Sequence, residues 1–214
     1  MPSYQLLSLD IWDTILRRDC HPDAIKVETA AVLLERHGGE LQEAYRNPRA
    51  LFRLRQDVER QLGAAKKAQG FDDEYAIQDV FRELLARAYR EPLPEAAAEE
   101  LASRLVAEEL AAEKRHVYLD PGIVAKIDSI PHERLVCISD FYADEAFLRE
   151  LLTAAGFSKP LERVLVSCDF GVNKRSGRLF EEAEKLLNVT PAAHMHLGDN
   201  AYSDVEVPKR LGIA

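Results

Sequence analysis

One long helical segment lies between a short apolar run near the N-terminus and a series of such runs after residue 116, and it constrains the fold most. Within residues 22–116, apolar side chains recur at the i, i+3, i+4, i+7 spacing of a helix face. The clearest stripe is Ile77, Val80, Phe81, Leu84, Leu85 and Ala88. We predict four helices here, two of them starting at Asn47-Pro48 and Asp72-Asp73. Basic residues interleaved with acids, such as Arg55, are expected on solvated faces.

The flanking segments have the pattern of a parallel α/β sheet. The first apolar run, 5–9, ends abruptly at Asp10 and is short enough to be a buried strand. Strands and helices then alternate; their expected ranges are 134–138, 144–155, 163–167, 176–187, 194–197 and 202–211. Helices should cover both faces of such a sheet. We therefore predict an α/β, Rossmannoid core of residues 1–20 and 117–214, with an all-helical domain of residues 21–116 inserted after the first strand.

The composition restricts the partners and the compartment. The net charge of −9 argues against nucleic acid, whose phosphates require a positive surface. Cys20, Cys137 and Cys168 are odd in number and far apart, so they predict neither a disulfide framework nor a zinc pattern. The sequence has no run of roughly 18 apolar residues, the length that a membrane helix requires. We expect a cytoplasmic protein without membrane insertion.

Polar residues follow four of the predicted strands, at the edge where parallel sheets bind ligands. They are Asp10, Ser139 with Asp140, Lys174, and Asp199 with Asp204. Asp10 is placed to attack phosphorus, and Ser139 and Lys174 to hold the phosphoryl oxygens. Asp199 and Asp204 complete an oxygen-ligand site of the kind that Mg²⁺ prefers. The set predicts phosphoryl transfer.

These segments resemble the motifs of the haloacid dehalogenase (HAD) superfamily of phosphatases and related hydrolases. The matching segments are Ser8 to Thr14, Ile138 to Asp140, Lys174 ahead of Ser176 to Phe180, and His196 to Asp204. The helical segment falls where that family places a cap domain. The amino-acid sequence of residues 12–14 and 138–142 is most similar to a branch of the superfamily found beside or fused to bacterial glycosyltransferases. The resemblance implies a HAD-like core with a helical cap.

The resemblance also implies catalytic and substrate-binding roles. Asp10 resembles the nucleophile that forms an aspartyl phosphate, and Ser139 and Lys174 resemble the groups that bind the phosphoryl oxygens. We expect Asp140 and Arg17 to meet the anionic substrate as well. Their alternative interpretations are a helix-capping residue and a surface charge.

The metal site that the resemblance implies holds Mg²⁺. Asp10 and Asp199 resemble its carboxylate ligands, and Asp204 matches the second acidic residue, which supports the metal directly or through water. The backbone carbonyl of Trp12 is a further expected ligand. Thr14 fits the threonine that closes the first motif, where its hydroxyl stabilises the turn.

Trp12 departs from the phosphatase pattern. Phosphatases of this superfamily usually have an Asp two residues after the nucleophile, where it acts as general acid and base. The indole of Trp12 cannot transfer a proton to the leaving group. Asp13 or Asp140 takes over the role of general acid and base, or no residue does. The simpler interpretation of Asp13 is a turn-forming residue, and that of Asp140 is a helix-capping residue. Dehalogenases also have an aromatic residue here, but the Asp199 and Asp204 pair favours phosphoryl transfer, since carbon–halogen displacement needs no cation.

We therefore expect a Mg²⁺-dependent phosphohydrolase for a small phosphorylated metabolite, with sugar and polyol phosphates as candidates. The alternative is a HAD-like module with weak or no turnover that serves as a binding or scaffold domain of a larger glycan-assembly protein. The chain stops at Gly212-Ile213-Ala214, where another strand is expected, which favours a part of a longer multidomain protein over a short sheet edge. His194 and His196 share one strand face, and we interpret them as structural.

Overall fold

The structure is a computed structural model and describes residues 4–214. Its internal contacts divide it into two compact units, one of residues up to Arg18 with Val117–Ala214 and one of Asp19–His116. We call them the sheet unit and the helical unit. We predicted the division after residues 20 and 116, and the units part after residues 18 and 116. Residues 1–3, which the predicted core range includes, lie outside the described residues.

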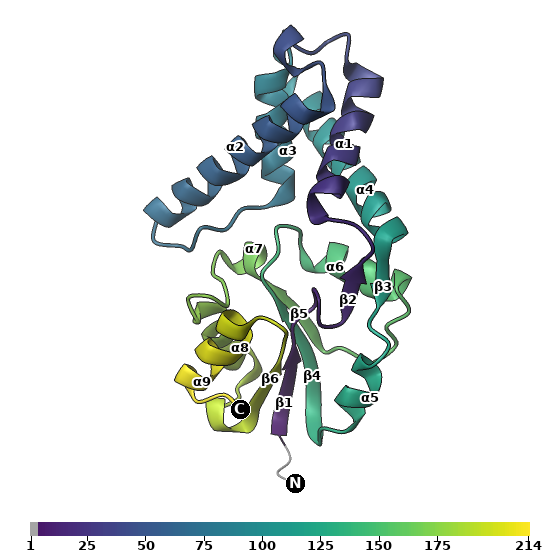
Figure 1. Ribbon diagram of the computed structural model, residues 1–214. Coiled ribbons are helices and arrows are strands. Elements are labelled where there is room, and N and C mark those ends of the chain that lie inside the picture. The colour runs from purple at the N-terminus through teal and green to yellow at the C-terminus, as the bar shows by residue number, and fades with distance from the viewer. Residues whose placement is uncertain (1–3) are drawn as a thin grey trace. The chain divides into compact units, whose positions relative to one another are not determined.

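A four-stranded parallel sheet in the order β5-β4-β1-β6 forms the sheet unit (Figure 1). Its strands are β1 (Tyr4–Leu9), β4 (His132–Ser139), β5 (Arg163–Val166) and β6 (His194–Leu197). Because β1 pairs with both β4 and β6, Leu9 lies opposite Cys137 on one side and Leu197 on the other. The parallel α/β class that we predicted is confirmed, and residue 10 follows directly from an inner strand.

Helices lie on both sides of this sheet. On one side are α5 (Ile123–Asp128) and α6 (Glu145–Ala154), and on the other α8 (Arg178–Leu187) and α9 (Val207–Leu211) (Figure 1). The α8 side has a fully buried apolar cluster that includes Leu6, Val136, Ile138, Leu179 and Phe180. Each such side chain contributes about 1.5–3 kcal/mol through burial. A short helix, α7 (Ser167–Phe170), follows β5, and β2 (Leu16–Arg18) pairs antiparallel with β3 (Val117–Leu119).

The helical unit contains the four predicted helices. They are α1 (Pro22–His37), α2 (Pro48–Ala68), α3 (Ile77–Ala88) and α4 (Glu95–His116). The predicted start at Asn47-Pro48 is confirmed, since Asn47 Oδ1 accepts the N–H of Ala50 at 2.8 Å. The predicted start at Asp72-Asp73 is wrong. That segment packs back on α2, where a side chain on Gly63 would come within 2.8 Å of the Asp73 carbonyl oxygen.

Arg55 is buried, so the expectation that it lies on a solvated face is wrong. It lies four residues after Leu51 and three before Val58, both buried, and therefore inside the apolar stripe of α2. Its Nε donates to Glu59 and its second terminal nitrogen to Glu109, both at 2.8 Å. Buried acids thus neutralise the guanidinium.

Among the helices of residues 4–214, none has both the length and the apolar character of a membrane span.

Candidate active site

Asp10 lies at the carboxyl end of β1, where a tight turn fixes it. The N–H groups of Ile15 and Leu16 both donate to the carbonyl of Ile11, at 2.9 and 2.8 Å, which folds the segment after Asp10 back on itself. The Asp10 side chain is only 9% exposed. Burial raises the pKa of Asp10 to about 6, although the charge of Lys174 lowers it. The carboxylate is thus held at a fixed place on the sheet edge.

Lys174 joins two carboxylates. Its Nζ lies 2.6 Å from Asp10 Oδ1 and 2.7 Å from Asp204 Oδ1, and its side chain is almost fully buried. Its backbone N–H also donates to Asp140 Oδ1 at 2.8 Å. Burial opposes the charge of Lys174, but the carboxylates of Asp10 and Asp204 outweigh it and raise its pKa. Lys174 is therefore an ammonium at neutral pH.

A helical turn after β6 positions Asp204. The turn, Ala201–Glu206, has π-helical hydrogen bonding, and the N–H of Asn200 before it donates to Asp204 Oδ2 at 3.0 Å. Gly198 lies against the Asp204 side chain, where an added Cβ would be 2.4 Å from Asp204 Cγ. Only glycine permits this approach. The Gly198-Asp199 pair is therefore a packing requirement of the site as well as a source of a carboxylate.

Three carboxylates converge on a cleft of about 500 Å³ in the sheet unit. Asp10, Asp199 and Asp204 each offer an oxygen, and these oxygens lie within 4.8 Å of one another. Burial, followed by the charge of Asp204, raises the pKa of Asp199. The structure thus brings together the three side chains that we predicted to bind Mg²⁺. Their role as ligands stays a prediction.

Three other predicted residues lie in different surroundings. Asp140 lines the same cleft. Ser139 is fully buried, and its hydroxyl has no hydrogen-bond partner within the described part of the chain. Arg17 is not among the residues that line the cleft; its Nε donates to Asp120 Oδ2 at 2.7 Å, because the β2–β3 pairing brings these segments together. Arg17 is thus engaged in a half-exposed ion pair, which matches its alternative interpretation.

Trp12 lines the same cleft as Asp10. The Arg18 guanidinium lies 3.4 Å from its ring centroid, and the Phe141 ring lies 5.2 Å away. The indole Nε1 is buried, with no hydrogen-bond partner in residues 4–214. Sequence reasoning did not find the Arg18 contact, because it depends on the turn between β1 and β2. A cation stacked on the indole adds positive charge beside the cleft.

Sequence reasoning also missed how His196 takes part. Its Nε2 lies 3.2 Å from Asp204 Oδ1, and its Nδ1 lies 2.7 Å from Ser8 Oγ. Burial would raise the pKa of Asp204, but the hydrogen bond from His196 and the charge of Lys174 together lower it well below the usual range. The structural role that we predicted for His196 therefore extends to the site itself. The shared strand face of His194 and His196 was the available signal.

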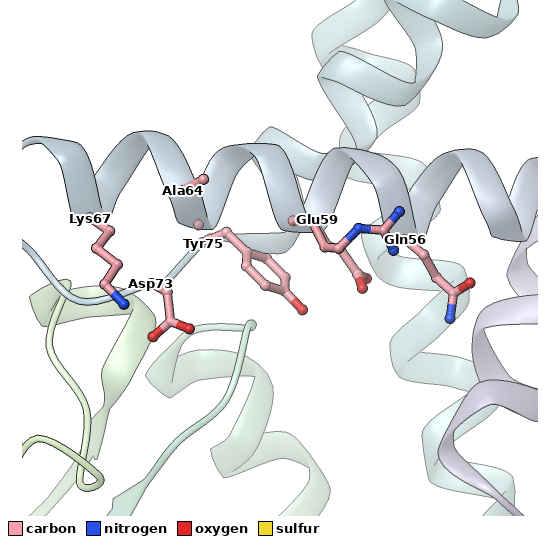
Figure 2. A pocket seen from close by; sticks show the side chains of 8 residues that line it. Gln56, Glu59, Ala64, Lys67, Asp73 and Tyr75 are labelled. Carbon is pink, nitrogen blue, oxygen red and sulfur yellow. The ribbon is translucent and has the colours of Figure 1, made fainter.

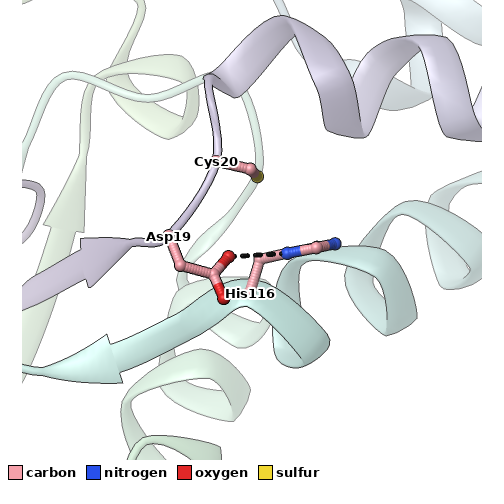
Figure 3. A group of neighbouring side chains, drawn as sticks. All are labelled: Asp19, Cys20 and His116. Atoms are coloured by element: carbon pink, nitrogen blue, oxygen red, sulfur yellow. Dashed lines mark hydrogen bonds and ion pairs between the residues drawn. The ribbon is translucent and has the colours of Figure 1, made fainter.

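Two further groups lie in the helical unit. Figure 3 shows Asp19, Cys20 and His116, whose ligand atoms lie within 4.8 Å of one another. His116 Nδ1 is 2.7 Å from Asp19 Oδ1, and the Asp19 N–H donates to the His116 carbonyl at 3.1 Å. We assign these contacts to holding the two ends of the unit together.

The second is a cleft of about 540 Å³ along α2, lined by both cationic and acidic side chains. In Figure 2, Lys67, Asp73 and Tyr75 project on the same side of α2 as Glu59. Burial, followed by the charge of Glu59, raises the pKa of the Tyr75 phenol, so it stays protonated. None of the predicted catalytic residues lines this cleft.

Solved structures share this architecture. A 2-haloacid dehalogenase from Pseudomonas syringae superposes with a TM-score of 0.68 at 18% identity, over 98% of this chain and 84% of that one. The chain has the haloacid dehalogenase fold. A protein named as a predicted phosphoglycolate phosphatase from Haemophilus somnus shares this HAD fold at a TM-score of 0.55 and 13% identity, over 100% and 84% of the chains. The HAD-hydrolase YfnB from Bacillus subtilis, solved with bound magnesium, superposes with a TM-score of 0.56 at 16% identity, over 99% of this chain and 87% of that one.

A phosphoserine phosphatase from Thermus thermophilus is similar in sequence. It is 30% identical over 152 residues, which are 71% of this chain and 60% of that protein. The chain thus spans less than two thirds of the length of the curated relative it matches. No protein-family model matches. The predicted HAD core is confirmed as a fold, while the glycosyltransferase-associated branch stays a prediction.

Proposed function

We propose that this HAD-fold chain is a Mg²⁺-dependent phosphohydrolase that works through an aspartyl phosphate. One observation carries the proposal: Asp10 shares a buried ammonium, Lys174, with Asp204, and both carboxylates face Asp199 within 4.8 Å. A nucleophilic carboxylate, a fixed cation and an oxygen-ligand cluster are the parts that phosphoryl transfer requires.

The donor set fits Mg²⁺. All three side chains offer oxygen, and octahedral Mg²⁺ holds its ligands at about 2.0–2.1 Å, so ligand oxygens lie at most about 4.2 Å apart. Asp10, Asp199 and Asp204 reach that spacing with small side-chain movements. The Trp12 carbonyl is the further ligand we propose. When bound, the ion neutralises phosphoryl charge and orients the ester.

The proposed reaction has two displacements at phosphorus. Asp10 Oδ2, which accepts a long 3.4 Å hydrogen bond from Thr14, attacks the phosphorus while the phosphorus–oxygen bond to the alcohol breaks. The Lys174 ammonium and the Ser139 hydroxyl hold the phosphoryl oxygens. Water then attacks the same phosphorus and gives a proton to the carboxylate that protonated the departing alcohol, the bond to Asp10 breaks, and inorganic phosphate leaves with the Asp10 carboxylate restored.

The departing alcohol needs a proton that Trp12 cannot supply. We propose that Asp140 provides it, since burial raises its pKa and it lines the cleft, with Asp13 as the competitor. Positioned acid catalysis contributes about 10²- to 10⁴-fold. Asp140→Asn should therefore slow alkyl phosphates far more than activated aryl phosphates, while Asp13→Asn should slow both equally or not at all. The reverse pattern assigns the proton to Asp13.

The substrate we propose is a small phosphate monoester. The Thermus relative is named a phosphoserine phosphatase, so phosphoserine joins sugar and polyol phosphates in the panel. The assay measures inorganic phosphate released with Mg²⁺, with the metal removed by chelation, and with Asp10→Asn. Turnover that depends on both Mg²⁺ and Asp10 supports the proposal. Turnover by Asp10→Asn at the wild-type rate excludes Asp10 as nucleophile.

A second candidate rests on Trp12. An aromatic residue stacked under Arg18 occupies the place of the usual acid, which suits a module that binds phosphate esters with weak or no turnover. Such a module would serve as a scaffold in a larger glycan-assembly protein. Binding of a panel ester without phosphate release, by calorimetry, favours it.

We also propose a cytoplasmic location and no nucleic-acid partner. Cys20, Cys137 and Cys168 are odd in number and far apart in the sequence, so they predict no disulfide framework, as is typical of a reducing compartment, and the net charge is −9. Fractionation of cells producing a tagged chain tests the location.

A further inference from the structure

A buried network of hydrogen bonds reaches the proposed metal site from the α8 side of the sheet. Its members, which we call the Ser8 network, are Glu184, His194, Ser8 and His196. Ser8 Oγ lies 2.7 Å from His194 Nε2 and 2.7 Å from His196 Nδ1. The outer end is His194 Nδ1, 3.1 Å from Glu184 Oε1, and the inner end is His196 Nε2, 3.2 Å from Asp204 Oδ1.

Strand register makes these contacts possible. Residue 6 of β1 pairs with His194, and Ser8 pairs with His196, so all three polar side chains point to the same sheet face. Ser8 and both histidines are almost completely buried. The Phe180 ring lies edge-on to His196, with centroids 4.8 Å apart, and covers it. Buried polar groups of this kind must satisfy one another.

The contacts of Asp204 determine which atom of His196 carries the hydrogen. Lys174 Nζ and the Asn200 N–H both donate to Asp204, so Asp204 is an ionised acceptor. His196 Nε2 must therefore carry the hydrogen. His196 is almost completely buried, and its Nε2 contacts the same Asp204 oxygen as the Lys174 ammonium, so a second positive charge on the ring is unfavourable. The ring is therefore neutral and leaves Nδ1 as an acceptor. The Ser8 hydroxyl then donates to His196.

The same logic continues outward. Because the single Ser8 hydrogen points to His196, Ser8 accepts from His194 Nε2. Burial, and then the neighbouring His196, lower the pKa of His194 to about 3, so His194 is neutral with a bare Nδ1. Glu184 must donate to that nitrogen as a carboxylic acid. Burial, and then Glu181, raise the pKa of Glu184 to about 7, which allows it.

We infer that the Ser8 network is a one-directional hydrogen-bond relay that starts at Glu184 and holds the Asp204 carboxylate in place. Its residues are positioning residues, since His196 alone touches Asp204 and the others set the tautomer of His196. Reversing the Ser8–His196 link in the neutral ring would move its hydrogen to Nδ1 and turn the Nε2 lone pair toward the Asp204 carboxylate. The inference rests on the proposed function for its catalytic consequence, but the tautomers are a property of the fold alone.

The direct test is ¹⁵N spectroscopy of the histidine rings in the full chain at pH 6. We expect both His194 and His196 as neutral rings protonated on Nε2, with signals assigned by their loss in His194→Gln and His196→Gln. An imidazolium, or a ring protonated on Nδ1, at either position overturns the inference. This result does not depend on turnover or on any metal.

The second test measures Mg²⁺ affinity by calorimetry. Removing residues that orient metal ligands typically weakens metal binding about 10- to 100-fold. Ser8→Ala, which cuts both links, should show this loss, and Thr29→Ala, which removes a buried hydroxyl in the helical unit, is the matched control and should show none. Equal affinities for Ser8→Ala and wild type overturn the positioning role.

Glu184 supplies a milder pair of variants, should Ser8→Ala fold poorly. Glu184→Gln keeps a donor for His194 Nδ1 and should keep both tautomers and the Mg²⁺ affinity, whereas Glu184→Met removes the donor and should lose them. Identical behaviour of the two variants overturns the relay. A wild type that binds Mg²⁺ without hydrolysing esters refutes the proposed function and leaves this test intact; one that does not bind Mg²⁺ refutes the metal site, and the tautomers then decide.

Discussion

Replacing Lys174 by Met tests the charge balance of the site. Met fills most of the lysine volume but removes an ammonium that lies 2.6 Å from Asp10 and 2.7 Å from Asp204. The two carboxylates then remain buried without their shared cation. Removing one partner of a buried pair costs about 3–5 kcal/mol, so we expect this loss in the free energy of unfolding at pH 8 without Mg²⁺.

The loss should shrink in acid. The pKa of Asp10 is about 6 in the folded chain, above its usual value of 3.8, so the folded state binds this proton more tightly than the unfolded state. Protonation therefore stabilises the folded state as the pH falls through the folded pKa. Without Lys174, which lowers it, that pKa is higher still. At pH 5.5 Asp10 is neutral in the variant, and about half the loss, roughly 2 kcal/mol, should remain.

Urea unfolding followed by the fluorescence of Trp12, the single tryptophan, reports on the sheet unit. Lys185→Met, which breaks the exposed ion pair with Glu182, is the control and should cost under about 1 kcal/mol at either pH. Asp10→Asn should remove part of the Lys174→Met loss at pH 8. A loss that is equal at pH 8 and pH 5.5 and unchanged by Asp10→Asn would refute the reasoning.

Three further outcomes are expected. Gly198→Ala should destabilise the chain by about 1–3 kcal/mol and weaken Mg²⁺ binding, because the new Cβ would lie 2.4 Å from Asp204 Cγ; unchanged denaturation and calorimetry would contradict this. Mg²⁺ at about 100 times its dissociation constant should stabilise the wild type by about 2.7 kcal/mol, and Asp199→Asn should reduce this gain in thermal unfolding. In ¹⁵N spectra, the rings of His194 and His196 should not become imidazolium between pH 8 and pH 5, since burial lowers both pKa values, to about 3 and about 4; an imidazolium signal from either ring above pH 5 would be inconsistent with the structure.

Much of the sheet could be predicted because a buried strand appears in the sequence as a short run of apolar residues. The strand predicted over residues 194–197 matches β6, and the apolar run ending at residue 9 matches the end of β1, since both segments are short and are followed at once by polar or glycine residues. The helix start predicted at Asp72-Asp73 shows where such sequence patterns mislead, since α3 begins at Ile77. Two acids before an apolar stripe look like a cap, but here the segment packs against Gly63 instead.

The parts of the site that the sequence did not reveal depend on which strands become neighbours. Ser8 is 186 and 188 residues away from its two histidine partners. The β1–β6 pairing brings the three side chains together, and apolar periodicity within each strand does not say which distant strands become neighbours. The Asp10 and Asp204 carboxylates were predictable as members of one site because each lies in a segment that resembles a motif of the superfamily. The hydrogen bonds that orient them were not.

The charge of the cleft gives the strongest reason to expect a bound cation. Asp10, Asp199 and Asp204 each offer an oxygen within 4.8 Å of the others, and the Lys174 ammonium pairs with two of the three, Asp10 and Asp204. Repulsion among them shows in the pKa of Asp199, which burial and Asp204 both raise. Such crowding costs stability unless positive charge enters. Because the inner strand β1 fixes Asp10 and the turn after β6 fixes Asp204, the carboxylates cannot separate to relieve it, and a divalent cation becomes the favourable way to balance the site.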